Sequence, residues 1–112
     1  MPNPTGSVYD GNQVDGTPNG RGKMTYADGV TYEGDYINGE RNGRGLLKWS
    51  DGEMYAGYWK NDKKHGVGTY LWRSCDVYEG EWVNDKKHGY GKMTYANGSI
   101  YEGEWLDDKI IT

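Results

Sequence analysis

Hydrophobic and polar residues alternate along this chain in short runs that are separated by turn residues. In residues 77–83, Tyr78 and Trp82 fall on one face, whereas Glu79 and Glu81 fall on the other. Alternation with a period of two is typical of a β-strand that has one buried and one exposed face. A second run of this kind is predicted at about residues 89–95.

Turn signals join these strands into hairpins. Residues 84–88, Asn-Asp-Lys-Lys-His, are predicted as one turn, and Ala-Asn-Gly at 96–98 turns the chain back. Asn-Gly and Asp-Gly pairs are strong hairpin signals because both central residues of a tight turn adopt positive φ. Such pairs recur at Asp28-Gly29, Asn38-Gly39, Asp51-Gly52 and Asn97-Gly98. We therefore predict an all-β fold, an antiparallel meander without helices.

The same pattern returns every 23 residues. Related five-residue runs start at Tyr32, Tyr55, Tyr78 and Tyr101, and a weaker copy starts at Tyr9. A fixed period in this range is typical of stacked repeats. We predict an elongated stack of hairpins that forms one domain over residues 9–112, with units starting at 9, 32, 55 and 78 and a truncated unit at 101. Residues 1–8 are predicted to be a flexible tail.

One face of the stack is predicted to be a core of rings and glycines. The chain has 11 Tyr, 5 Trp and no Phe, and only 34% of its residues are hydrophobic. Tyr and Trp bury a large ring while keeping a polar group for hydrogen bonding, which suits a thin structure. Because glycine weakens a strand unless something approaches closely, we expect Gly57 and Gly80 to lie beneath aromatic rings.

Charge and cysteine content exclude some classes of function. The net charge is -4 and the sequence pI is about 5.1, which argues against nucleic-acid binding. A single cysteine, Cys75, cannot form an internal disulfide, so a reducing, cytoplasmic compartment is expected. No apolar run approaches the ~20 residues of a membrane span.

The repeat also carries a family signature. Residues 78–98 read Tyr-Glu-Gly-Glu-Trp-x-Asn-x-Lys-x-His-Gly-x-Gly followed by Asn-Gly, which resembles the membrane occupation and recognition nexus (MORN) repeat. The resemblance covers almost the whole chain. It implies an elongated β-hairpin stack and a scaffolding role in cytoskeletal, ciliary or membrane-junction assemblies, often as a dimer. Phosphoinositide binding has been proposed for some proteins with this repeat.

Several positions depart from the repeat. Gln13 and Asn19 replace an aromatic residue and a histidine in the first unit, which suggests an N-terminal cap. In the third unit, Ala56 and Tyr58 stand where acids are expected, and Ser74-Cys75 stands where Asp-Gly is expected. We interpret Cys75 as a neutral change in an irregular turn. The fifth unit stops before its His-Gly-x-Gly strand.

The third unit is the first candidate site, a partner-binding patch. On the face opposite the rings, acids and bases occupy most positions in the other units, and we interpret these rows mainly as a solvated surface. In the third unit they give way to apolar and aromatic residues, which we expect to contact a protein segment, a peptide or helix, in the repeat groove. The residues are Met54, Ala56, Tyr58, Val67, Thr69 and Leu71. The alternative is that the chain's own tail covers them.

Two equivalent turns supply the second candidate site, a basic edge for an anionic ligand such as an acidic lipid headgroup. Its residues are Lys63, Lys64, His65, Lys86, Lys87 and His88. The simpler interpretation is that charged turns prevent edge-to-edge pairing. We expect no metal site, no cofactor and no catalytic group, because the histidines and carboxylates recur as parts of the repeat.

The C-terminal strand is the third candidate site, an association edge formed by Tyr101, Trp105 and Ile110. It is predicted to lack a return strand, and an uncovered strand edge favours pairing with another chain. Three outcomes are open: the tail folds back, two copies form a symmetric dimer, or a different protein docks. We favour intermolecular pairing, because a turn at 107–109 leaves few residues to fold back.

These features favour a non-enzymatic scaffold or adaptor that binds proteins through an extended β-repeat surface. The cytoskeletal or ciliary setting is implied by the family resemblance alone. The alternative is a peripheral module that binds phosphoinositides or other acidic lipids. The acidic net charge and the absence of an amphipathic anchor favour the scaffold.

Overall fold

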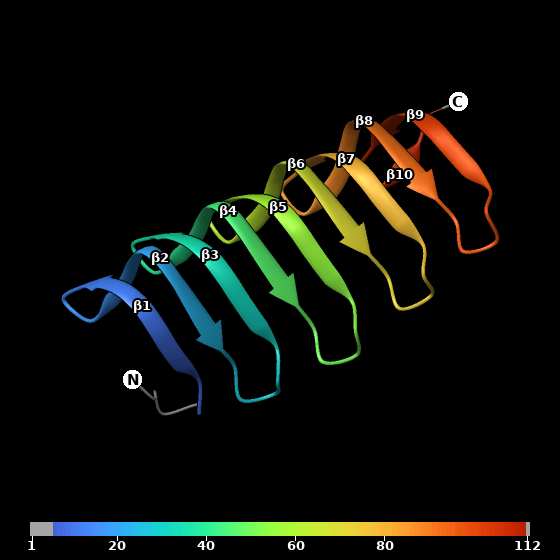
Figure 1. The fold of residues 1–112 in the computed structure, drawn as a ribbon. Coiled ribbons are helices and arrows are strands. Elements are labelled where there is room, and N and C mark those ends of the chain that lie inside the picture. Colours follow the sequence, from blue (N-terminus) through green and yellow to red (C-terminus); the bar gives the residue numbers. More distant parts are fainter. Residues whose placement is uncertain (1–5, 112) are drawn as a thin grey trace.

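A computed structural model describes residues 6–111 of the chain, and in this range it is built from strands and turns without helices (Figure 1). The all-β prediction is confirmed. The ten strands are β1 (Val8–Val14), β2 (Thr17–Thr25), β3 (Thr31–Ile37), β4 (Glu40–Lys48), β5 (Met54–Lys60), β6 (Lys63–Leu71), β7 (Val77–Val83), β8 (Lys86–Thr94), β9 (Ile100–Leu106) and β10 (Lys109–Ile110).

The strands form one antiparallel sheet in which each strand pairs with its neighbours in the sequence, from β1 to β10. The molecule measures 48 × 24 × 17 Å, and Figure 1 shows the hairpins side by side along the long axis, from the N-terminal blue to the C-terminal red. The predicted elongated meander is therefore confirmed. We number its repeats 1 to 5 from the units that start at residues 9, 32, 55, 78 and 101.

Two-residue turns close one end of each hairpin. Asn38 and Gly39 have φ of 51° and 82°, and Asn84 and Asp85 have φ of 49° and 71°. Positive φ at both central residues matches the natural twist of a hairpin, so the return strand starts at once. β8 therefore begins at Lys86. The predicted turn over residues 84–88 is wrong, because Lys-Lys-His belongs to the strand.

Longer loops join one hairpin to the next. In the loop at 26–30, the Tyr26 N–H donates to the Val30 carbonyl, and the Asp28 carboxylate accepts the Val30 N–H. Only the glycine of the Asp28-Gly29 pair has positive φ, at 91°. In the corresponding loop of repeat 3, Cys75 adopts this left-handed conformation with φ of 77°. The position thus keeps its geometry without glycine, at the cost of some backbone strain.

Each hairpin bends sharply near its middle. Gly80 pairs with Gly91 and Trp82 pairs with Lys87, so Glu81 faces three residues of β8, 88–90. The bend closes over the ring-bearing face. Lys64 and Tyr70 are six residues apart in β6, a span of about 20 Å in an extended strand, yet Nζ of Lys64 is 5.6 Å from the centre of the Tyr70 ring. We call this the inner face, and the opposite side the outer face.

Rings laid over glycines fill the inner face. Tyr32, Tyr55 and Tyr78 have no exposed surface. The Tyr55 ring lies over Gly57 and Gly68, so that a Cβ on either glycine would collide with its hydroxyl group. Tyr78 covers Gly80 and Gly91 in the same way, which confirms the prediction that Gly57 and Gly80 lie beneath aromatic rings.

Hydrogen bonds from these rings tie each repeat to itself and to its neighbour. The Tyr55 hydroxyl donates to the carbonyl of Tyr58 over 2.9 Å. The indole Nε1 of Trp59 donates to the Gly45 carbonyl in the preceding repeat over 3.2 Å, and its ring meets Tyr55 edge-on at 5.1 Å. The polar atoms of Tyr55 and Trp59 are thereby satisfied, as burial usually requires.

The first strand begins one residue before the predicted domain start at residue 9. Val8 already belongs to β1, and Ser7 is buried at 5% exposure. Residues 1–5 of the predicted flexible tail lie outside the described residues.

Candidate functional site

Outer-face side chains form rows that run across the strands. One row joins Glu33, Leu46, Ala56, Thr69 and Glu79, each opposite the next in the sheet. Charged residues stand at its two ends, and uncharged residues occupy the part that crosses β4, β5 and β6. The break in the charged pattern therefore coincides with repeat 3 and extends back into repeat 2.

A hollow of about 610 Å³ lies on this part of the outer face. Predicted patch residues Ala56, Tyr58, Val67 and Thr69 line it, and the side chains of Tyr58 and Val67 are 46% and 60% exposed. The other two predicted residues, Met54 and Leu71, pair with each other one row away and do not line the hollow.

Charged side chains surround the apolar floor. Arg44 places its guanidinium 5.8 Å from the centre of the Tyr58 ring. Asp35 accepts a hydrogen bond from the Arg44 N–H over 3.1 Å and forms an exposed ion pair with Arg21 at 3.5 Å. Across the patch, Val67 pairs with Glu81. The arrangement is suited to binding an apolar side chain with charged neighbours, because the surrounding charges can discriminate between partners.

Sequence reasoning missed the residues of this hollow that come from repeats 1 and 2. They are Arg21, Glu33, Asp35, Arg44 and Leu46. Their position follows from the cross-strand register, which depends on the two-residue turns and on the bend. Leu46 carries the signal that could have found them, since it is an apolar residue at an outer-face position.

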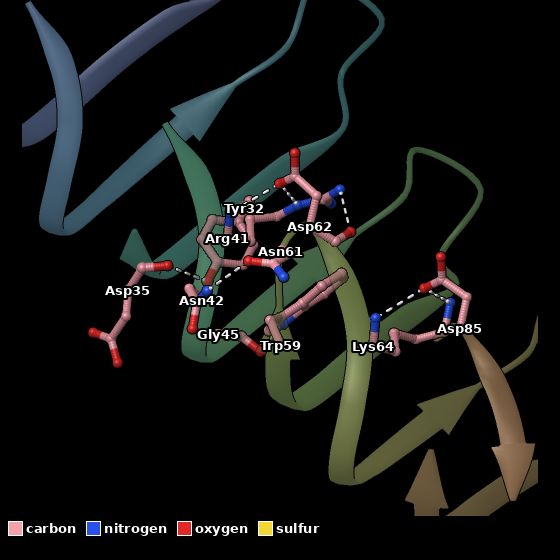
Figure 2. A network of polar contacts seen from close by, with 10 residues as sticks. All are labelled: Tyr32, Asp35, Arg41, Asn42, Gly45, Trp59, Asn61, Asp62, Lys64 and Asp85. Carbon is pink, nitrogen blue, oxygen red and sulfur yellow. Dashed lines mark hydrogen bonds and ion pairs between the residues drawn. The ribbon is translucent and has the colours of Figure 1, made fainter. Parts of the chain in front are cut away.

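A second set of polar contacts joins the turn of each hairpin to the preceding hairpin (Figure 2). We call each such set of contacts a clasp. Asp62, in the turn of repeat 3, accepts hydrogen bonds from N–H and Nε of Arg41 over 2.8 and 3.0 Å. The Asp62 N–H donates back to the Arg41 carbonyl over 3.0 Å. The Arg41 guanidinium also lies 4.5 Å from the Trp59 ring centre. Because the cation is both paired and stacked, it belongs to the structure of the stack.

The lysines at the equivalent positions make the same clasp. Nζ of Lys64 is 3.4 Å from the Asp85 carboxylate, and Nζ of Lys87 is 3.3 Å from that of Asp108. Their side chains are only 16% and 13% exposed. Figure 2 shows Lys64 and Asp85 joined beside Trp59.

The predicted basic edge is therefore corrected in its geometry. Lys64 and Lys87 lie in strands and are held by carboxylates, and His65 and His88 are half-buried. Of the six predicted residues, only Lys63 and Lys86 are exposed. The physical reason is that a two-residue turn leaves the three residues after it in the strand, where the middle one points toward the inner face.

The C-terminal strand is partly covered by the chain's own fold-back, so the prediction that it lacks a return strand is wrong. The turn takes only Asp107 and Asp108, and β10 then pairs Ile110 with Trp105. Trp105 is consequently 4% exposed. Tyr101 remains half-buried, with its hydroxyl donating to the Glu104 carbonyl over 3.2 Å. Association of the rest of β9 with another chain stays a prediction.

Buried tyrosines of the inner face have raised pKa values. Burial raises the pKa of Tyr78 to about 12, and the nearby Glu81 carboxylate adds to the effect. Burial likewise raises the pKa of Tyr55 and Tyr70. Within residues 6–111, no group of three or more His, Cys, Asp or Glu side chains could hold a metal ion. In the same range, no helix has the length and hydrophobicity to cross a membrane.

Comparison with known proteins identifies the repeat. The family model of the MORN repeat matches five consecutive segments, residues 9–31, 32–54, 55–74, 78–100 and 101–110. The third match ends at Ser74, next to the position where Cys75 replaces the turn glycine. No curated protein matches the chain at the level of similarity required.

Proposed function

Since the chain belongs to the MORN-repeat family, we propose that it is a non-enzymatic scaffold that binds a protein segment on the outer face of repeats 2 and 3. One observation supports this most: the charged outer surface is interrupted by uncharged residues that form the floor of a hollow of about 610 Å³ and include an exposed tyrosine. We call the residues Leu46, Ala56, Tyr58, Val67 and Thr69 the outer-face patch.

The energetics of such a surface favour protein binding. Tyrosine supplies a large rigid contact area at a small entropic cost, and it is common among residues that dominate interface energies. Arg21, Asp35, Arg44 and Glu81 form a charged rim, which favours a partner that carries matching charges. A contiguous group of exposed apolar side chains, unlike a single one, often marks an interaction site.

A displayed library of protein segments tests the proposal. Segments selected on the immobilised chain are expected to bind the chain in solution, with the affinity measured by isothermal titration calorimetry. Tyr58→Glu combined with Val67→Asp is expected to weaken that binding at least tenfold, because it places two carboxylates in the hollow.

A matched double variant on the same face is the control. Tyr90 in β8 and Ile100 in β9 are exposed and lie outside the patch, so Tyr90→Glu with Ile100→Asp adds the same two negative charges elsewhere on the outer face. This control is expected to bind selected segments with less than a threefold change. Equal loss in both variants, or no loss in the patch variant, would contradict the assignment of the site.

We rank binding of acidic lipids second, because two of the predicted cations are already paired with carboxylates. On the predicted edge, the exposed lysines Lys63, Lys86 and Lys109 would have to carry it. A cytoplasmic location, a cytoskeletal or ciliary setting, and association through β9 are further parts of the proposal. They are supported by the single cysteine, the family resemblance and the uncovered length of β9 respectively.

A further inference from the structure

The inner face is filled unevenly, because repeat 3 contains a complete cluster of rings and repeat 2 does not. In repeat 3, the Tyr70 ring lies between those of Trp49 and Trp72, with centroid distances of 5.4 and 4.5 Å. Its hydroxyl donates to Oε1 of Glu53 over 2.8 Å. Oε2 of Glu53 accepts the Arg73 N–H over 3.1 Å. A ring and a carboxylate together therefore fill the space between neighbouring hairpins.

One period earlier, both of these groups are replaced by smaller ones. Leu47 stands where Tyr70 does, and Val30 stands where Glu53 does. A hollow of about 530 Å³ lies there on the inner face, between Tyr26 and Trp49. Its lining consists of Ser7, Tyr26, Ala27, Asp28, Val30, Arg41, Leu47 and Trp49.

The lining repeats the surroundings of Tyr70. Subtracting one period of 23 residues from Trp49, Trp72 and Lys64, which contact the Tyr70 ring, gives Tyr26, Trp49 and Arg41. All three line the hollow. The hollow in repeat 2 is thus the space that repeat 3 fills with an aromatic ring.

Electrostatics favour a ring over an anion as the occupant. In repeat 3, Lys64 is held by Asp85 at 3.4 Å and still lies 5.6 Å from the Tyr70 ring centre. Arg41 is held by Asp62 at 3.0 Å in the same manner. Because its charge is already matched by a carboxylate, Arg41 gains little from a second anion. It can still attract the electron-rich face of a ring, as its contact with Trp59 at 4.5 Å shows.

We propose that this hollow is a socket for an aromatic side chain of a partner protein. Phenylalanine is expected to fit at least as well as tyrosine, because Val30 cannot accept the hydrogen bond that Glu53 accepts from the Tyr70 hydroxyl. The socket opens on the inner face, whereas the outer-face patch lies on the opposite side of the sheet. The scaffold would therefore have two separate binding sites.

The probe is N-acetylphenylalaninamide, titrated into the full isotopically labelled chain and followed by NMR. Saturable shifts are expected at Val30, Leu47 and the Trp49 indole, with a millimolar dissociation constant, because a single side chain buries little area. N-acetylleucinamide, which lacks a ring, is the control probe and is expected to bind at least threefold more weakly.

Exchanging residues between the repeats gives the decisive variants. Leu47→Tyr with Val30→Glu rebuilds the filling of repeat 3, so the probe shifts should disappear and the melting temperature should rise. Tyr70→Leu with Glu53→Val should open a second socket and add saturable shifts at the Trp72 indole. Met93→Leu, at the equivalent inner-face position of repeat 4, is the control and should leave probe binding unchanged.

Four results would overturn the proposal. They are the absence of saturable shifts, equal responses to both probes, probe shifts that persist in the filled variant, and shifts that appear only after residues 1–5 are removed, since the last would make the chain's own N-terminus the occupant. The Tyr58→Glu, Val67→Asp variant separates this proposal from the outer-face function. It should bind the probe normally, whether or not it binds a selected segment.

Discussion

The two faces of this single sheet differ in how closely their residues repeat. On the inner face the same contact recurs from repeat to repeat, so that the hydroxyls of Tyr32, Tyr55 and Tyr78 each donate to a carbonyl three residues ahead over 2.9 Å. On the outer face the equivalent positions differ, and Ala56 in repeat 3 corresponds to Glu79 in repeat 4. The fold therefore requires these tyrosine contacts to repeat, whereas the outer-face residues can vary without loss of the fold.

Among the changes considered, alkaline pH should lower the stability of the inner face most. Burial raises the pKa of Tyr78 to about 12, and it also raises the pKa of Tyr32, Tyr36, Tyr55 and Tyr70. A raised tyrosine pKa stabilises the fold fully below pH 10, and this stability is lost as pH rises through the folded-state pKa.

For Tyr78, the loss from pH 10 toward pH 12 is about 1.4 kcal/mol per pH unit. The other buried tyrosines lose stability in the same direction, so unfolding is expected as the pH rises toward 12. Urea denaturation at a series of pH values measures it. In Tyr78→Phe the free energy of unfolding should fall less steeply with pH, because one titrating tyrosine is missing. An unchanged slope would contradict the burial argument.

Substituting a glycine beneath a ring should have the next largest effect. Gly68→Val places a branched side chain against the Tyr55 hydroxyl, and overpacking of this kind costs about 3 kcal/mol. Thr69→Val, at the adjacent outer-face position, should change stability by less than about 0.5 kcal/mol. Thermal melting of the two variants compares the faces directly. Similar melting temperatures would show that the faces are not distinct.

Removing a clasp should have a smaller effect. Asp85→Ala removes the acceptor of the Lys64 N–H and leaves alanine at a φ of 71°, so a loss of about 2 kcal/mol is expected. Asp85→Asn keeps an oxygen acceptor and tolerates this backbone conformation, so it should lose less than about 1 kcal/mol. Chemical denaturation of both variants measures the difference. If Asp85→Asn were as destabilising as Asp85→Ala, the ion pair would be the main contribution of the clasp.

Substitutions in the outer-face patch should have the smallest effect on stability. Tyr58 and Val67 are about half exposed, so Tyr58→Glu with Val67→Asp should change the free energy of unfolding by less than about 0.5 kcal/mol. Binding of selected segments should nevertheless fall at least tenfold. A large drop in melting temperature would instead place these residues in the structural part of the sheet.

The fold could be predicted from the sequence because its signals are local and recur. Alternation defines the strands, and the period places Tyr78 over Gly80 without knowledge of the distant parts of the chain. The turn length could not be read as reliably. Lys86, Lys87 and His88 are polar, as turn residues usually are, yet an Asn-Asp pair with positive φ closes the hairpin before them.

The candidate site was predictable only where its residues depart from the repeat, and not where their place depends on the strand register. Tyr58 and Val67 were identified by their departure from the repeat, which needs no coordinates. Arg44 and Leu46 come from the neighbouring repeat, and their place in the hollow depends on the strand register. The inner-face hollow at Leu47 required comparison of equivalent contacts in repeats 2 and 3, since a leucine in a core pattern gives no warning of unfilled space.

Because the clasp is the same between successive repeats, the stack can be lengthened by adding repeats. The two residues of each clasp are 21 positions apart, so successive clasps are alike. The pairs are Arg41 with Asp62, Lys64 with Asp85 and Lys87 with Asp108. Duplicating one unit inserts a hairpin with a complete set of clasps on both sides. Each such step lengthens the stack by two strand spacings, about 10 Å. The length of the stack would therefore change in equal steps of one hairpin.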